Sequence, residues 1–157
     1  MACMNESTPS GEKYGRWEFI TGDTKDKEDL KVLDVAAYGD EPRGLQNSPS
    51  GSGMILREGN RPIGFVFMDV DNGLRHDKSV LFISYLFILP KMRNPVLMAQ
   101  LVSKLQNFAQ KQHATHIGWG SQSPAMAHLS RRVDSSDSNI ILLPLDQFRL
   151  DTFAYGI

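Results

Sequence analysis

The sequence predicts an α/β fold, in which helices pack on a central β-sheet. Residues Val80–Leu89 are apolar at nearly every position, as expected for a strand that is covered on both faces. The next segment, from about Arg93 to Gln112, repeats leucines at helical spacing, which predicts a long helix directly after that strand. Two β-rich segments, Met54–Arg57 and Ile63–Val70, precede them and flank a Gly-Asn turn, the pattern of an antiparallel hairpin.

The remaining segments continue this mixture of strands and helices. Before the hairpin we expect a strand at Trp17–Ile20, a helix at Lys25–Tyr38 and a surface loop at Gly39–Gly53. The loop is rich in glycine, proline and serine, so we expect it to be mobile, either as a cover for a cleft or as a spacer. After the long helix we expect a strand at Ile117–Ser121, a helix at Pro124–Val133, and strands at Ile140–Leu145 and Phe148–Phe153.

The size and composition of the chain fit one globular domain. It has 157 residues, of which 41% are hydrophobic and 22% are charged, close to the averages of globular proteins. Residues 1–15 form a polar leader with almost no apolar side chains, which we expect to be flexible alone and ordered only against a protein partner. The folded domain is therefore expected to span residues 16–157.

Composition also argues against several classes of function. The longest apolar run, Val80–Leu89, is too short to span a membrane, and the amino terminus has no apolar signal segment, so we expect a cytoplasmic protein. A single cysteine, Cys3, excludes an internal disulfide and a cysteine-based zinc site. The formal net charge is −1 and the basic residues are scattered, which gives no nucleic-acid signal.

The order of the predicted elements resembles the GNAT superfamily of N-acetyltransferases over nearly everything after residue 16. A closer likeness lies in residues 88–101, ILPKMRNPVLMAQL, which resemble the strand-to-helix loop that binds acyl-coenzyme A in that family. There a strand end and a proline precede an Arg or Gln, two spaced glycines and a leucine-rich helix. The resemblance implies a mixed, mostly antiparallel sheet flanked by helices, with acetyl-coenzyme A as the cofactor.

Within this loop the resemblance assigns cofactor binding to Ile88, Leu89, Arg93, Asn94, Val96, Leu97 and Met98. Arg93 matches the family's Arg or Gln, whereas Val96 and Met98 occupy the two glycine positions. The physical basis is that amide donors at the positive end of a helix converge on a pyrophosphate, and glycines let the backbone come close. A side chain at either glycine position could obstruct the phosphates.

A second likeness lies at residues 119–130, WGSQSPAMAHLS, which resemble the segment after the family's next strand. The resemblance aligns Ser123 with an Asn that helps to hold the cofactor, and Ser130 with a Tyr that often protonates the departing thiolate. Serine can hydrogen-bond a cofactor but is a poor general acid near neutral pH. Ser130 would therefore be a weaker proton donor than the family's Tyr.

Acetyl transfer needs a base for the acceptor amine and an acid for the sulfur. Candidate bases are Asp69 and Asp71 on or beside the hairpin strand and His76 just beyond it, although each is also typical of a solvated turn. Tyr85 interrupts the apolar central strand and either reaches a bound thioester or is a hydrogen-bonded core residue. We select Asp69, Tyr85 and Ser130 as catalytic candidates.

Two other groups of polar residues receive no role. His113 and His116 lie near the end of the long helix, but no carboxylate or cysteine lies nearby in sequence to complete a metal site. Arg131 and Arg132 could receive a phosphate, yet adjacent basic residues on a helix usually face water. We therefore assign no metal ligands.

Two functions are consistent with these observations. The first is an acetyl-coenzyme A-dependent N-acyltransferase that acts on a small-molecule amine or a protein amino group. The second is a catalytically inactive GNAT-like structural or binding module that has lost its cofactor loop, because a fold does not fix a function. In its stretch from Trp119 to Leu129 the chain looks like the divergent GNAT-like domains of bacteriophage proteins, which include virion components, so such a module would be expected in a host cytoplasm or a virion.

Overall fold

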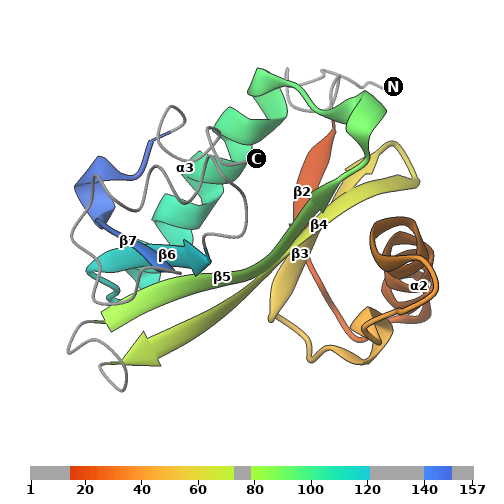
Figure 1. Cartoon of the computed structure of the whole chain (residues 1–157), viewed down its shortest axis with the longest axis horizontal. Coiled ribbons are helices and arrows are strands. Elements are labelled where there is room, and N and C mark those ends of the chain that lie inside the picture. Colours follow the sequence, from red (N-terminus) through yellow and green to blue (C-terminus); the bar gives the residue numbers. More distant parts are fainter. Residues whose placement is uncertain (1–14, 73–78, 121–139, 150–157) are drawn as a thin grey trace, which may run out of the picture. The chain divides into compact units, whose positions relative to one another are not determined.

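The computed structural model describes residues 15–72, 79–120 and 140–149. Its six strands form one sheet in the order β2-β3-β4-β5-β6-β7 (Figure 1). The pairs β2–β3, β3–β4 and β6–β7 are antiparallel, whereas β5–β6 is parallel. The mixed, mostly antiparallel sheet implied by the sequence resemblance is therefore confirmed.

The first strand and the first helix form where the sequence predicts them. Strand β2 covers Arg16–Phe19, and helix α2 covers Thr24–Tyr38. Asp23 caps this helix, because its Oδ1 accepts a hydrogen bond from the Asp26 amide at 2.8 Å. A 3-10 helix, η1, follows at Leu45–Asn47 in the loop before the hairpin.

The hairpin and the interior strand also confirm the sequence predictions. Strands β3 (Gly53–Glu58) and β4 (Arg61–Asn72) are joined by a turn in which Gly59 has a φ of 62°, a left-handed conformation that glycine adopts without steric cost. Strand β5 covers Ser79–Ile88 and lies between β4 and β6. Its cover is less complete than predicted, since Tyr85 is 37% exposed.

The elements after β5 begin with a second 3-10 helix, η2, at Pro90–Met92, which leads into helix α3 at Pro95–Lys111. The chain then forms strand β6 at His116–Gly120, strand β7 at Ile140–Pro144 and a 3-10 helix, η3, at Leu145–Gln147.

Two further predictions can be compared with the described residues. The helix predicted at residues 124–133 cannot, because it lies outside them. Phe148 is not the start of a strand, because its amide donates to the Leu145 carbonyl and closes η3. No helix in the described part of the chain is long and apolar enough to cross a membrane.

The chain divides into two compact units, Met1–Phe67 with Tyr85–Gln100, and Met68–Ser84 with Leu101–Ile157. The core of the first unit joins α2, η1 and the hairpin through Ile20, Leu30, Leu33, Leu45, Ile55, Phe65 and Phe67. In the second unit the rings of Trp119 and Phe148 meet edge-on, with centroids 5.9 Å apart. The single domain over residues 16–157 stays a prediction. Of the polar leader, residues 1–15, the structure describes only Gly15.

A buried carboxylate fixes the loop that follows α2. Asp34 is 1% exposed and accepts hydrogen bonds from three successive amides, those of Arg43, Gly44 and Leu45, at 2.8–3.1 Å. Gly44 lies in the left-handed region with a φ of 71°, which helps the three amides to converge. The loop predicted to be mobile is therefore tied to α2 at this point.

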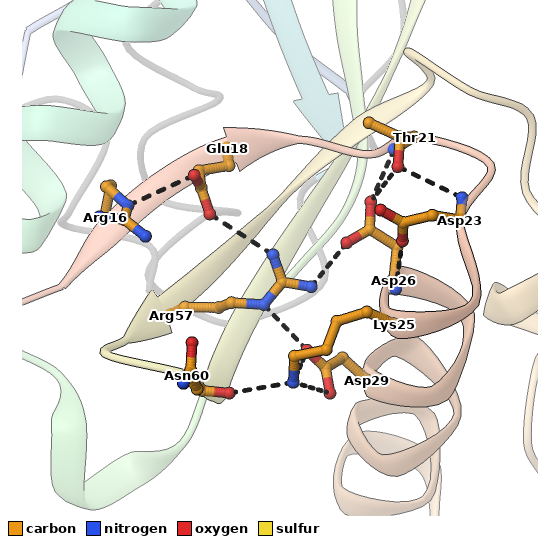
Figure 2. Close-up of polar contacts among 9 residues, drawn as sticks. All are labelled: Arg16, Glu18, Thr21, Asp23, Lys25, Asp26, Asp29, Arg57 and Asn60. Carbon is orange, nitrogen blue, oxygen red and sulfur yellow. Dashed lines mark hydrogen bonds and ion pairs between the residues drawn. The ribbon is translucent and has the colours of Figure 1, made fainter.

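An ion-pair network joins α2 to β3 (Figure 2). The Arg57 guanidinium donates from Nη2 to Asp26 at 2.6 Å and from Nε to Asp29 at 2.8 Å. Asp26 also accepts the amide and hydroxyl of Thr21 at 2.7 and 2.9 Å. Lys25 bonds Asp29 and the carbonyl of Asn60 in the hairpin turn. The polar side of α2 is thereby held to the hairpin.

The network determines the protonation of Asp26. Burial alone would raise the pKa of this carboxyl group, but the hydrogen bonds from Thr21 and Arg57 outweigh that effect and lower it below the ordinary value. A lowered pKa means that Asp26 stabilises the folded state above the pKa of the unfolded chain. This contribution is lost as the pH falls through the folded-state pKa.

We predict that Arg57→Met lowers the free energy of unfolding by about 3–5 kcal/mol at pH 7, because it leaves the buried carboxylate of Asp26 without its cation. The deficit relative to the unmodified chain should shrink as the pH is lowered toward about 5, since the unpaired Asp26 carboxyl group then binds a proton. Urea unfolding at several pH values measures both effects. The matched control is Arg16→Met, whose ion pair with Glu18 is exposed and should contribute less than about 1 kcal/mol.

We also predict that Asp34→Ala lowers the free energy of unfolding by about 2–3 kcal/mol, because three loop amides lose their acceptor. Asp34→Asn keeps one carbonyl oxygen, so its free energy of unfolding should lie between those of the unmodified chain and Asp34→Ala. The control Asp40→Ala removes an exposed carboxylate nearby and should stay within about 0.5 kcal/mol. Equal values for Asp34→Ala and Asp40→Ala in urea unfolding would contradict the anchoring role.

Candidate active site

The turn between β5 and α3 combines a strand end, a 3-10 turn and a capped helix. Ile88 ends β5 with a buried side chain, and Pro90 opens η2. Asn94 caps α3, because its Oδ1 accepts a hydrogen bond from the Leu97 amide at 3.0 Å. The Leu97 carbonyl accepts the Trp17 indole N–H at 3.3 Å, which fastens the first turn of α3 to β2.

Most backbone amides of this turn are bonded within the turn itself. Pro95 has no amide, and four others donate to neighbouring oxygens: those of Met92, Arg93, Leu97 and Met98. Within the described residues, the amides of Asn94 and Val96 make no hydrogen bond. The positive end of α3 therefore keeps two free donors for an anion.

Arg93 places a positive charge at the same turn. Its side chain is exposed, and its Nε donates to the Ile88 carbonyl at 2.8 Å, so the guanidinium folds back over the strand end. The Leu89 amide donates to the Ile63 carbonyl at 2.9 Å. The main-chain groups of Ile88 and Leu89 that make these bonds are thus already engaged by the protein.

The side chains of Val96 and Met98, which stand at the family's two glycine positions, differ in their exposure. Val96 is 40% exposed on the first turn of α3, whereas Met98 is 6% exposed and belongs to the core. Because Met98 is buried, its side chain does not stand over the turn where an anion would lie. The expectation that both side chains could obstruct phosphates is therefore corrected for Met98 and remains for Val96.

Tyr85 lies in an aromatic cluster in the first unit. Its ring meets Tyr38 edge-on with centroids 6.1 Å apart, and Phe67 edge-on at 6.4 Å. Burial raises the pKa of the Tyr38 hydroxyl, Tyr85 and Asp34 add to this rise, and Arg43 opposes it. Tyr85 is more exposed than Tyr38 and Phe67, so part of this residue is open to solvent.

Asp69 and Ser84 come together in the second unit. The Ser84 hydroxyl donates to Asp69 Oδ2 at 2.8 Å, and the pair is exposed. Asp71 is half-buried and makes an interaction of its own. The other candidate residues, His76, Ser123 and Ser130, lie outside the described residues, as do Arg131 and Arg132, which received no role. In the part of the chain that the structure describes, no three potential metal ligands gather in one place.

The parallel ladder between β5 and β6 is short. It joins Val80–Ile83 to residues 116–119, whereas β5 continues to Ile88. Residues 84–88 of β5 therefore extend beyond this described ladder. A strand edge of this kind can hydrogen-bond an extended ligand through its main chain.

Sequence reasoning missed the capping role of Asn94 and the contact between Arg43 and Tyr38. Asn94 was expected to bind a cofactor, and its capping role could have been found from its place directly before Pro95, since Asn and Pro favour the Ncap and N1 positions. Tyr38 and Arg43 had no local signal, because their contact depends on the Asp34 bonds to the loop.

The chain matches the model of the acetyltransferase (GNAT) family over residues 17–130, which is more than half of its length. It therefore belongs to the GNAT family of acetyltransferases, whose members use an acyl-coenzyme A to acetylate amines. The matched region contains the turn between β5 and α3. A search of curated proteins found no match.

Solved structures support the same fold. A chain of the NatC complex bound to Gag peptide and CoA has a TM-score of 0.60 at 15% identity, covering 83% of this chain and 98% of its own. The aminoglycoside acetyltransferase AAC(6')-Iy, in complex with a bisubstrate analogue, has a TM-score of 0.54 at 16% identity, with coverages of 70% and 80%. Ard1 from Thermoplasma volcanium has a TM-score of 0.54 at 11% identity, with coverages of 83% and 95%. At these identities the likeness concerns the fold alone, and none of these relatives supports a bacteriophage or virion assignment.

We predict that Asn94→Ala lowers the free energy of unfolding by about 1 kcal/mol, because the Leu97 amide loses its cap. Asn94→Asp keeps the acceptor and should preserve stability. The matched control is Asn107→Ala, which changes an exposed position on the same helix and should stay within about 0.5 kcal/mol. Thermal and urea unfolding compare the three variants, and equal losses for Asn94→Ala and Asn107→Ala would contradict the cap.

Proposed function

We propose that this chain is an acetyl-coenzyme A-dependent N-acyltransferase that acetylates a small-molecule amine or a protein amino group. The observation that carries the proposal is the turn at the start of α3. It combines two free amides, on Asn94 and Val96, with the positive end of a 17-residue helix and the exposed cation of Arg93. Free amides at a helix start and a guanidinium suit the pyrophosphate of a coenzyme A.

In this proposal each loop residue has a separate part in cofactor binding. Arg93, Asn94 and Val96 face the pyrophosphate, and the Leu97 amide joins them when the Asn94 side chain turns away from it. Met98 supports the helix from the core. Ile88 and Leu89 lead the cofactor arm along the edge of β5, and Ser123 is a further hydrogen-bonding partner.

The transfer step needs two proton movements, for which the chain has candidate residues. The bound cofactor supplies an acyl thioester, and a neutral amine forms a C–N bond as the C–S bond breaks. Asp69 is the proposed acceptor of the amine's proton, and one of its oxygens already binds Ser84. Tyr85 is the proposed proton donor to the sulfur, because a phenol is a better acid than the Ser130 hydroxyl.

The second candidate function, an inactive binding module, is favoured by a specific feature of the same turn. Asn94 caps the Leu97 amide, and Pro95 removes another donor, so the first turn of α3 is largely satisfied without a ligand. The exposed Val96 side chain adds bulk where a phosphate would approach. Cofactor binding therefore distinguishes the two functions.

We predict that acetyl-coenzyme A stabilises the folded chain, by about 2.7 kcal/mol at a hundred times its dissociation constant. Val96→Gly should bind the cofactor more tightly, because it removes the side chain that stands at the free amides. Calorimetric titration gives both affinities, and thermal unfolding gives the stabilisation.

The control Val32→Gly introduces the same change at an exposed position of α2 and separates the cost of glycine in a helix from an effect on the loop. It should leave the affinity unchanged. An absence of binding at millimolar cofactor, in both the unmodified chain and Val96→Gly, would leave the binding module as the better account.

A further inference from the structure

Arg43 is an exposed cation held over an aromatic ring. Its Cζ lies 4.8 Å from the centroid of the Tyr38 ring, a distance typical of a cation–π contact. No ion pair to Arg43 occurs within residues 15–72, 79–120 and 140–149, and its guanidinium keeps donors that the ring does not use. Arg43 can therefore bind an anionic group without first losing a carboxylate partner.

The position of Arg43 is built into the fold. Its own amide is the first of the three that donate to the buried Asp34 carboxylate, and the left-handed Gly44 follows it. A long side chain on a free loop would sample many positions, but this backbone is tied on both sides of its Cα. The guanidinium is thus presented at a defined place beside Tyr38.

Tyr38 connects Arg43 to β5. Its ring meets Tyr85 edge-on, and Tyr85 lies three residues before Ile88, where the proposed cofactor turn begins. Tyr85 is 37% exposed, so this side of the cluster is open to solvent. A guanidinium and two aromatic rings therefore lie next to one another in a single unit, and one of the rings, that of Tyr85, belongs to the strand that leads into the proposed cofactor turn.

None of the acidic side chains near Arg43, Tyr38 and Tyr85 in the described residues pairs with the Arg43 guanidinium. Asp34 is buried and its oxygens accept the three loop amides. Asp40 and Glu41 are exposed on the same loop, and in the described residues neither forms an ion pair with Arg43. A ligand carboxylate can therefore compete for the guanidinium, which binds carboxylates through two parallel hydrogen bonds.

We propose that Arg43, Tyr38 and Tyr85 recognise the acceptor, and that they select an amine that lies close to a carboxylate, as at the amino terminus of an acidic peptide. The inference rests on the proposed function, since it names the acceptor class for that site. Arg43, held over the Tyr38 ring, binds the carboxylate, while the partly exposed ring of Tyr85 attracts the ammonium group before it loses its proton. A polycationic amine is disfavoured at this position, because it meets a like charge.

The test is calorimetric titration of the full chain with two tripeptide amides that begin with Glu or with Gln and are otherwise identical. The Glu peptide should bind at least about threefold more tightly at low ionic strength, as expected for an accessible ion pair. Arg43→Gln should remove this preference, and Arg43→Lys should keep part of it, because the charge remains but the forked geometry is lost. Added salt should weaken the preference in the unmodified chain.

The control is Arg61→Gln, which removes an exposed arginine that pairs with Glu58 at the hairpin turn. It should keep the full preference for the Glu peptide. Equal affinities for the two peptides, an unchanged preference in Arg43→Gln, or no binding of either peptide at millimolar concentration would each overturn the inference.

A separate titration of the same samples with acetyl-coenzyme A tests the proposed function. Cofactor binding without a peptide preference rejects only the acceptor assignment. A peptide preference without cofactor binding rejects the acyltransferase and leaves Arg43 as part of a peptide-binding site.

Discussion

Backbone amides in the first turn of a helix have no partners within the helix, and the way they are satisfied governs what the turn before α3 can bind. Asn94 takes the Leu97 amide, and Pro95 contributes none. The amides of Asn94 and Val96 are left over. An anion at this turn therefore meets two free amides, fewer than the four unpaired donors with which a helix can begin.

Three acidic side chains of α2 stabilise the fold through buried contacts. Asp26, Asp29 and Asp34 are all buried on this helix, and each is satisfied by a partner outside it. Two of them bind Arg57 on β3, and the third organises the loop with Arg43. The same helix therefore holds the hairpin and positions the residues that we infer to meet the acceptor. Its last residue, Tyr38, carries the contact to β5.

Particular elements show why some expectations succeeded. The spacing of Leu97, Leu101 and Leu105 predicted α3, and all three are fully buried. Pro90 and Pro95 predicted the break between strand and helix, because proline acts on its own neighbours. The sequence could not predict which of the side chains of Val96 and Met98 is buried. Both stand at family glycine positions, but only the packing of the core decides that Met98 turns inward.

The sequence by itself determined the order of strands and helices, the hairpin turn and the place of the candidate cofactor loop. These features depend on side-chain periodicity and on proline and glycine, which act over a few residues. The tertiary structure alone decided which amides stay free, which acids are buried and which ring Arg43 covers. These outcomes depend on contacts between residues far apart in the chain, such as Trp17 with Leu97 and Asp26 with Arg57, and no local pattern encodes them.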